Sequence, residues 1–165
     1  KLFALGVDAL VESVRLVREG KAPRIVQDES QQTYEPPAGD SNSAIAWMRP
    51  AREVYDLIRG SNPSPGAHAM LYATQVRIFD ARLTLLDDPN ATGGTARTEH
   101  GGYPVAPGAI LASESDRIDI ALLGGVLLAH RLQRDGGKKL PAVEFAAEMG
   151  VGAGDGFEDG GVANA

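Results

Sequence analysis

The 165-residue sequence contains no cysteine, which excludes a disulfide framework and any zinc site built on thiolates. No apolar run approaches the ~18 residues that a membrane-spanning helix needs. No signal peptide is recognisable either, so a cytoplasmic protein is expected. Aromatic residues make up 5% of the chain, and the net charge is −6. Because nucleic-acid binding rests mainly on basic residues and stacking aromatics, this composition disfavours tRNA as a partner.

The sequence also lacks the spacings of familiar catalytic motifs. No H-x-x-x-H or H-E-x-x-H pattern and no carboxylate cluster links the three histidines, which are His68, His100 and His130. No metal site is therefore predicted. His130 alternates with apolar neighbours, which favours a partly buried, hydrogen-bonded histidine. The strand and helix that flank a nucleotide-binding loop are missing around the glycine-rich stretches near residues 93, 101 and 152.

Among the features that are present, the first is an amphipathic stretch near the start. Apolar residues recur at helical spacing from Val7 to Val17, so a helix is predicted from about Val7 to Arg18. Its apolar face has no obvious partner within the chain. Residues 20–43 are rich in proline and polar residues, as is typical of a linker between domains. Because the first residue is Lys1 rather than methionine, we expect a piece of a longer protein whose N-terminal part is absent.

The middle of the chain predicts a helix followed by strands. Pro50 suits a first helical turn, because its missing N–H would be unpaired there in any case. Ala51, Val54, Leu57 and Ile58 then fall on one stripe at helical spacing, and Gly60 is placed to end the helix. Two strand-like stretches follow, residues 68–73 and 75–86. The apolar alternation in the second changes phase near Phe79 or the next residue, as a β-bulge would produce.

The remaining chain predicts further strands and one more helix. Residues 87–107 form a turn-rich loop, and Gly124-Gly125 forms a hairpin turn because glycine accepts positive φ. The strand-like stretches of this half are residues 109–113, 118–122 and 126–133. Five short strands in this order favour an α+β fold built on a small antiparallel β-barrel with flanking helices. Pro141 opens a final helix with Val143, Ala146 and Met149 inward, and residues 151–165 are expected to be a flexible tail.

Four basic residues lie close together in sequence before the last helix. They are Arg131, Arg134, Lys138 and Lys139. They form a candidate basic patch, while Asp135 among them favours the alternative of a solvated hairpin end.

Several motifs, in matching order, resemble the folate-dependent formyltransferase family, of the methionyl-tRNA formyltransferase and 10-formyltetrahydrofolate dehydrogenase type. The central ones are Ile45-Ala46-Trp47, Ile58-Arg59 and Pro65-Gly66-Ala67. Upstream, the resemblance rests on Gly20-Lys21-Ala22-Pro23-Arg24, Gln27 and Thr33-Tyr34. Downstream, it rests on Pro107-Gly108, Leu132-Gln133, Gly137-Lys138-Lys139 and Val143-Glu144-Phe145.

The resemblance implies a domain plan. Residues 44–150 would be the OB-like C-terminal barrel domain, residues 20–43 the linker, and residues 1–19 the last helix of a missing Rossmann-like catalytic domain. That missing domain would bind the formyl donor, 10-formyltetrahydrofolate, and it carries the family's catalytic asparagine, histidine and aspartate. None of their motifs is present in this chain, so no catalytic residue is assigned here.

The resemblance also bears on two groups of residues. In the family, the linker crosses from one domain to the other at the positions of Gln27, Thr33 and Tyr34. A role at that junction and a plain solvated linker both remain open. In the tRNA-modifying relatives, the barrel offers a basic surface to the nucleic acid, which is the role that the candidate basic patch would have.

Three functional hypotheses follow. The first is the C-terminal module of an enzyme that transfers or hydrolyses the formyl group of 10-formyltetrahydrofolate, bracing its own catalytic domain and shaping access for water or a small-molecule acceptor. The second is a tRNA-binding or other nucleic-acid-binding barrel. The third is an interaction domain that only holds a dimer or a partner together.

Overall fold

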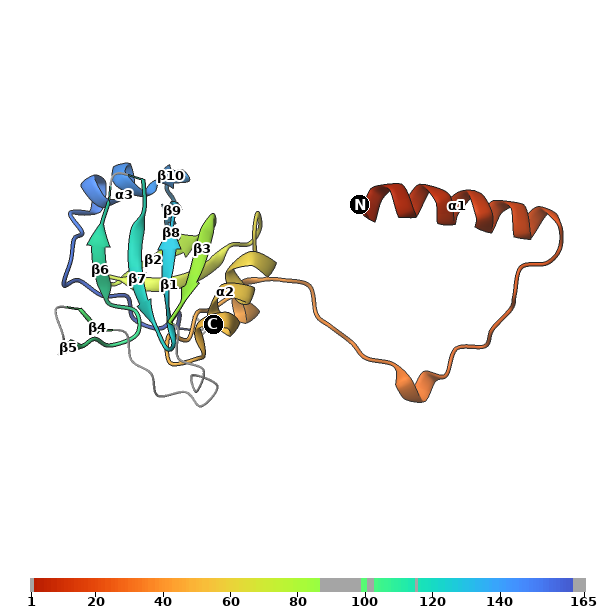
Figure 1. Ribbon diagram of the computed structural model, residues 1–165, viewed down its shortest axis with the longest axis horizontal. Helices are drawn as coiled ribbons and strands as arrows, with labels where there is room; N and C mark the ends of the chain where they lie inside the picture. The colour runs from red at the N-terminus through yellow and green to blue at the C-terminus, as the bar shows by residue number, and fades with distance from the viewer. Residues whose placement is uncertain (1, 87–98, 101–102, 115, 162–165) are drawn as a thin grey trace. The chain divides into compact units, whose positions relative to one another are not determined.

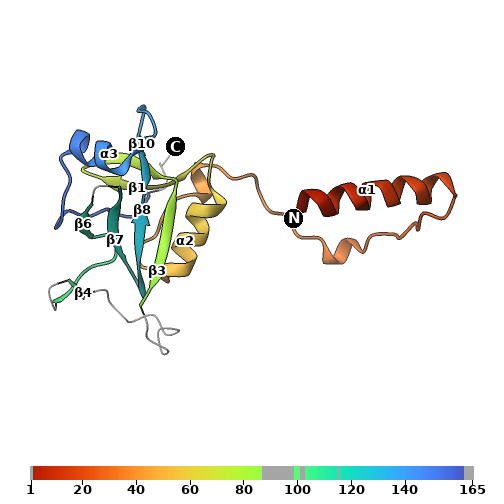
Figure 2. The same ribbon diagram turned by 45° about the horizontal axis from the view of Figure 1, so that its top comes forward.

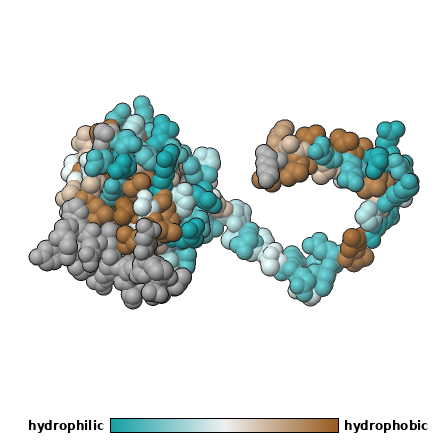
Figure 3. All heavy atoms as spheres, in the orientation of Figure 1, coloured by the Kyte–Doolittle hydropathy of each residue, from teal (hydrophilic) through white to brown (hydrophobic). Residues whose placement is uncertain are grey.

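The computed structural model describes residues 2–86, 99–100, 103–114 and 116–161. Its contacts divide the chain into two units, Lys1–Pro36 and Pro37–Ala165. The first unit holds helix α1 (Leu2–Arg18) and an extended segment with one 3₁₀ turn, η1 (Glu29–Gln31). The predicted first helix is therefore present, although it begins five residues earlier than expected. No residue of α1 is buried, and its apolar side chains lie on the surface (Figure 3).

The second unit contains two four-stranded antiparallel sheets, ordered β1-β2-β9-β10 and β3-β8-β7-β6, and a two-stranded pair, β4-β5 (Figure 1). The α+β class and the barrel-like antiparallel architecture predicted from the sequence are confirmed. The strands of the first half are β1 (Ala67–Leu71), β2 (Thr74–Ile78), β3 (Ala81–Leu85), β4 (Glu99–His100) and β5 (Tyr103–Pro104). Those of the second half are β6 (Ile110–Ser113), β7 (Ile118–Leu122), β8 (Gly125–Ala129), β9 (Arg131–Arg134) and β10 (Leu140–Pro141).

The two sheets are joined where long strands bend. Only Phe79 and Asp80 separate β2 from β3, and only His130 separates β8 from β9. The carbonyl oxygen of Asp80 accepts hydrogen bonds from the backbone N–H groups of both His130, at 2.7 Å, and Arg131, at 3.3 Å. Two residues facing one is the pattern of a β-bulge. The predicted phase shift at this point is thus explained by a bend that moves the chain from one sheet to the other.

Two helices cover the sheets. Helix α2 (Ala51–Gly60) lies along β3, and α3 (Ala142–Met149) lies at the end that carries β9 and β10 (Figure 2). In α2 the predicted stripe is confirmed for Ala51, Val54 and Ile58, which are buried. In α3 the prediction is wrong for Val143, which is exposed, while Ala142, Phe145 and Ala146 are buried. At 3.6 residues per turn, these three share one face and Val143 points away from it.

The segment after α3 packs against the barrel. Phe157 is buried with its ring centroid 5.6 Å from that of Trp47, and Glu158 exchanges backbone hydrogen bonds with Met70. The backbone N–H of Gly160 donates to the carbonyl of Ile45 at 2.8 Å. The expectation of a flexible tail is therefore wrong for residues 151–161, and residues 162–165 lie outside the described part.

Other boundaries also differ from the sequence expectations. The barrel unit begins at Pro37 rather than at residue 44, and its entry carries a 3₁₀ turn, η2 (Asp40–Asn42). Leu122 pairs with Gly125, so the turn of the β7–β8 hairpin is Leu123-Gly124, with the positive φ of 84° at Gly124. Of the predicted loop 87–107, residues 87–98 and 101–102 lie outside the described part.

Candidate functional site

The four residues of the candidate basic patch come from β9 and the turn that follows it, and all four are exposed or half-buried at the surface. The Nε atom of Arg134 is 2.7 Å from Glu148 Oε1, and the Nε atom of Arg131 is 4.0 Å from Asp80 Oδ2. Lys139 donates to the carbonyl of Pro63 at 2.9 Å, and its ammonium lies 3.6 Å from the centroid of the Phe79 ring. Lys138 makes no contact of this kind within the described residues. The patch is therefore mostly neutralised or anchored, with Lys138 as its freest charge.

A hollow of about 490 Å³ lies beside this patch, at the bend between β2 and β3. We call it the bend hollow. It is lined by Arg59, Asn62, Phe79, Asp80, Ala81, Arg82, Asp116 and His130. The candidate basic patch adjoins this hollow, because two patch residues contact residues that line it: Arg131 lies near Asp80, and Lys139 covers the ring of Phe79. The bend in the strand thus forms a polar depression that no single sequence motif indicates.

Positive and negative groups balance in the bend hollow. Two arginines and two aspartates line it, and Asn62 Nδ2 donates to Asp80 Oδ1 at 3.3 Å. His130 Nδ1 lies 3.1 Å from the carbonyl oxygen of Asp116, so this nitrogen carries the proton and donates it. His130 Nε2 is buried without a partner among the described residues. The expectation of a hydrogen-bonded, partly buried His130 is therefore met by one ring nitrogen only.

The chemistry available in the bend hollow is limited to polar contacts. Among the residues that the structure describes, no three histidine or carboxylate side chains gather closely enough to hold a metal ion. Arginine and asparagine donors beside aspartate oxygens suit the recognition of a polar surface rather than bond-making.

None of the described helices combines the length and apolar character that crossing a bilayer requires.

A second polar cluster lies where the chain enters the barrel. His68 is buried in β1, its backbone N–H donates to the carbonyl of Ser43 at 2.9 Å, and its Nδ1 lies 3.3 Å from Ser43 Oγ. Burial, followed by the nearby positive charge of Arg77, lowers the pKa of His68. Hydrogen bonds from Arg77 lower the pKa of the Asp40 carboxyl.

The predicted junction residues all lie in the first unit. Gln27, Thr33 and Tyr34 are exposed, and they make no side-chain hydrogen bond or ion pair within the described residues. The structure therefore brings none of them into a site.

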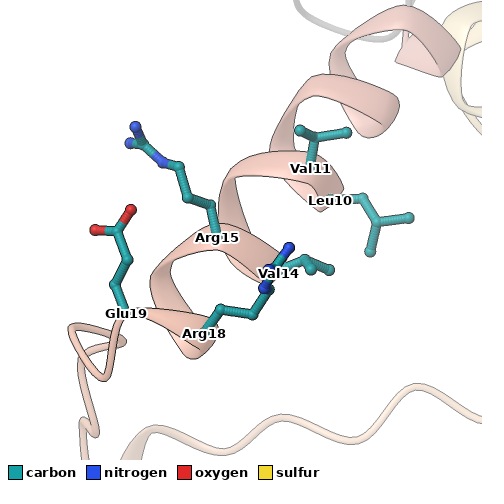
Figure 4. Close-up of a pocket in the computed structure, with 6 residues that line it drawn as sticks. All are labelled: Leu10, Val11, Val14, Arg15, Arg18 and Glu19. Carbon is teal, nitrogen blue, oxygen red and sulfur yellow. The ribbon is translucent and has the colours of Figure 1, made fainter.

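A groove of about 720 Å³ runs along α1 in the same unit and is lined by Leu10, Val11, Val14, Arg15, Arg18 and Glu19. Figure 4 shows Leu10 and Val11 on one side of the helix and Arg15 and Glu19 on the other. An uncovered apolar stripe of this kind is what a helix presents to a packing partner.

The chain belongs to the family described as the formyl transferase C-terminal domain, whose model matches residues 39–150. It is 39% identical over 97 residues to methionyl-tRNA formyltransferase of Moorella thermoacetica, covering 59% of this chain and 30% of that protein. It is 32% identical over 148 residues to cytosolic 10-formyltetrahydrofolate dehydrogenase of Xenopus tropicalis, covering 87% of this chain and 15% of that protein.

Solved structures agree on the fold. The crystal structure of HypX from Aquifex aeolicus in complex with tetrahydrofolic acid superposes with a TM-score of 0.62 at 17% identity, covering 87% of this chain and 23% of HypX. At that identity the likeness supports the fold alone. The chain spans less than half the length of the curated relatives it matches, for example 30% and 15% of the two named above.

Proposed function

We propose that this chain is the C-terminal part of an enzyme that uses 10-formyltetrahydrofolate to transfer or hydrolyse a formyl group. The family match over residues 39–150 carries this proposal. Both named relatives are formyl-handling proteins by name, and one name contains the donor itself. The enzyme would work in the cytoplasm.

In this proposal, α1 is the last helix of a catalytic domain and the segment up to residue 36 is the linker. The apolar stripe of α1 supports this role, because a helix with no buried residue in its own unit needs another surface to cover it. Gln27, Thr33 and Tyr34 would line the passage between domains. The barrel would brace the catalytic domain and shape the entrance for the acceptor.

The chemistry itself is assigned to the catalytic domain. Formyl transfer needs a group that moves protons and donors that stabilise the oxyanion of a tetrahedral intermediate. The described residues of the bend hollow offer polar recognition, and no nucleophile with an adjacent base is found there. The donor 10-formyltetrahydrofolate would therefore bind outside this chain.

The direct test uses the longer protein that contains this chain and a folate-binding domain. It is incubated with formyl-labelled 10-formyltetrahydrofolate, with and without aminoacylated tRNA. Release of labelled formate without an acceptor is expected for the hydrolase type, and label on the tRNA for the transferase type. Absence of both turnover and folate binding would contradict the proposal.

Charge distribution favours water or a small-molecule acceptor over tRNA. Carboxylates lie within 4.0 Å of most arginines in the described barrel unit, namely Arg49, Arg59, Arg77, Arg117, Arg131 and Arg134. Paired arginines neutralise fewer phosphates, and phosphate neutralisation supplies most of the affinity for nucleic acid.

A second candidate is a tRNA-binding barrel, favoured by the 39% identity to a protein named methionyl-tRNA formyltransferase and by the charge of Lys138, which has no partner within the described residues. A gel shift with tRNA at several salt concentrations tests it. Lys138→Glu is expected to weaken a genuine complex and to reduce its salt dependence, whereas Arg52→Glu on the exposed side of α2 serves as the charge-matched control. A shift that is equal in both variants, or absent, rules this candidate out.

A further inference from the structure

The barrel entry is held by an arginine that bridges three separate segments. Arg77 lies in β2, directly opposite His68 of β1 in the strand register. Its Nη1 and Nη2 atoms donate to the two carboxylate oxygens of Asp40, at 2.8 and 3.1 Å. Nη1 also lies 3.3 Å from the carbonyl oxygen of Pro65 and 3.4 Å from that of Gly66. A planar guanidinium with several donors can connect η2, the turn before β1 and β2 in this way, which a lysine cannot match.

The chain on either side of Asp40 is held as well. Asn42 Oδ1 accepts from the backbone N–H of Gly39 at 2.7 Å, and Asn42 Nδ2 donates to the carbonyl of Pro37 at 3.1 Å. Ala44 pairs in parallel with His68, and the backbone N–H of Ile45 donates to the His68 carbonyl at 2.8 Å. Residues 37–42 are therefore held by Arg77 and by their own hydrogen bonds, and residues 43–45 by β1, instead of forming a free tether.

The two partners differ in exposure. The side chain of Arg77 is 19% exposed, whereas that of Asp40 is 63% exposed. An ion pair with one solvated partner contributes little to global stability. The hydrophobic core of the barrel does not depend on this ion pair, because the chain is anchored just after Asp40 by the buried side chains of Ile45 and Trp47. Loss of the Asp40 carboxylate is thus expected to release residues 37–42 while leaving the barrel folded.

We propose that Arg77 is a positioning residue, which, through Asp40, fixes the place and direction in which the linker leaves the barrel. This proposal rests on the proposed function, since the linker would tether the catalytic domain. Anchoring at Asp40 limits the flexible tether to the residues before Pro37. A shorter tether restricts the orientations that two linked domains can sample.

The anchoring is tested without reference to activity. Because the chain has no cysteine, Ala38→Cys and Glu144→Cys provide the two thiols for spin labels, one on the entering chain and one on the exposed side of α3. The distance distribution between the labels is measured in chains that carry Asp40→Asn, Asp40→Glu or no further change. We expect a distribution at least twofold broader in Asp40→Asn, a return toward the original width in Asp40→Glu, and a melting temperature unchanged in both.

Glu53→Gln is the matched control, because it breaks an exposed ion pair with Arg49 in the same unit, at 3.3 Å. An unchanged width in Asp40→Asn overturns the proposal. So does broadening accompanied by a large fall in melting temperature, since Arg77 would then hold the barrel together rather than position the linker.

The consequence for catalysis is measured in the longer protein with labelled 10-formyltetrahydrofolate. Asp40→Asn is expected to lower kcat/KM for formyl turnover several-fold with unchanged affinity for the folate. Broadening with unaltered turnover would overturn the positioning role in the reaction. Broadening in a protein that shows no turnover before mutation would instead contradict the proposed function and leave the anchor in place.

Discussion

Two helices of this chain are amphipathic, but only one of them is covered. Helix α2 buries Ala51, Val54 and Ile58 against the sheets, whereas α1 buries none of its residues. Helices of about this length are marginal in water on their own, so most of their stability comes from packing an apolar face. The apolar face that helical periodicity creates is therefore buried within the barrel unit and left uncovered within the first unit.

The largest expected effect is at the centre of the covered region. Trp47 is buried, lies against the tilted ring of Phe157, and donates its ring N–H to the carbonyl of Glu158 at 3.2 Å. Trp47→Ala is expected to lower the free energy of unfolding by about 3–5 kcal/mol, because it removes a large side chain from a closed core. Urea unfolding followed by far-UV circular dichroism measures this. A loss below about 1 kcal/mol would mean that the segment 151–161 does not close over Trp47 in solution.

A smaller effect is expected where this segment meets the barrel entry. A Cβ on Gly160 would collide with the carbonyl oxygen of His68 and lie close to Ile45 N and Ala44 Cα. Gly160→Ala is expected to cost about 1–3 kcal/mol through overpacking. A Cβ on the adjacent Gly161 would meet no heavy atom of the described residues within 4 Å, so Gly161→Ala is the control and should change stability by less than ~0.5 kcal/mol. Equal effects of the two substitutions on the melting temperature would contradict this packing.

The covered region should also respond to acid in a characteristic way. The pKa of His68 is lowered in the fold, by burial first and then by Arg77, so the unfolded chain binds a proton more readily than the folded one. The contribution of His68 to the free energy of unfolding is therefore complete above its ordinary pKa of 6.5, and it decreases as the pH falls below that value. Thermal unfolding between pH 7.5 and 5 measures the loss, and His68→Gln should flatten this part of the profile. The pKa of the exposed Asp40 is lowered by Arg77 as well, but its contribution is small and is lost only as the pH falls below its ordinary 3.8.

The smallest effect is expected on the uncovered helix. Leu10→Ala on α1 should change the unfolding free energy of this chain by less than ~0.5 kcal/mol, because the side chain is exposed. In the longer protein, where a catalytic domain would cover the stripe, the same substitution should cost about 2–5 kcal/mol. Differential scanning calorimetry of both proteins, each with and without Leu10→Ala, measures the two effects. An equally small effect in the longer protein would contradict the assignment of α1 to a catalytic domain.

Much of the fold was predictable because the spacing of apolar residues within short stretches indicates helices and strands. The stripe of α2, the strand at residues 118–122 and the phase shift at Phe79 are properties of neighbouring residues, and each was recognisable without a structure. Val143 and the tail were misjudged for one shared reason. The buried face of α3 is set by the strands against which the helix packs. The burial of Phe157 likewise requires a partner far away in the sequence, which is Trp47.

The candidate sites were less accessible to such reasoning. The basic residues after β8 were found as a run in the sequence, but their carboxylate partners, Asp80 and Glu148, come from other elements. The pairing of Arg77 with Asp40 joins residues 37 positions apart, and nothing in either neighbourhood indicates it. Long-range ion pairs leave no periodic signal, because they depend on where strands bend rather than on spacing along the chain.

The three helices, the main strand stretches, the phase shift at Phe79 and the family were readable from the amino-acid sequence, since each of these is encoded by spacing and by short motifs. Three features depend on the three-dimensional fold: which charges are neutralised, the closure of residues 151–161 over Trp47, and the contact through which Arg77 holds the entering chain at Asp40. The spacing of apolar residues along the chain determines secondary structure, whereas the contacts of a charged or aromatic side chain depend on which distant segments the whole backbone brings beside it.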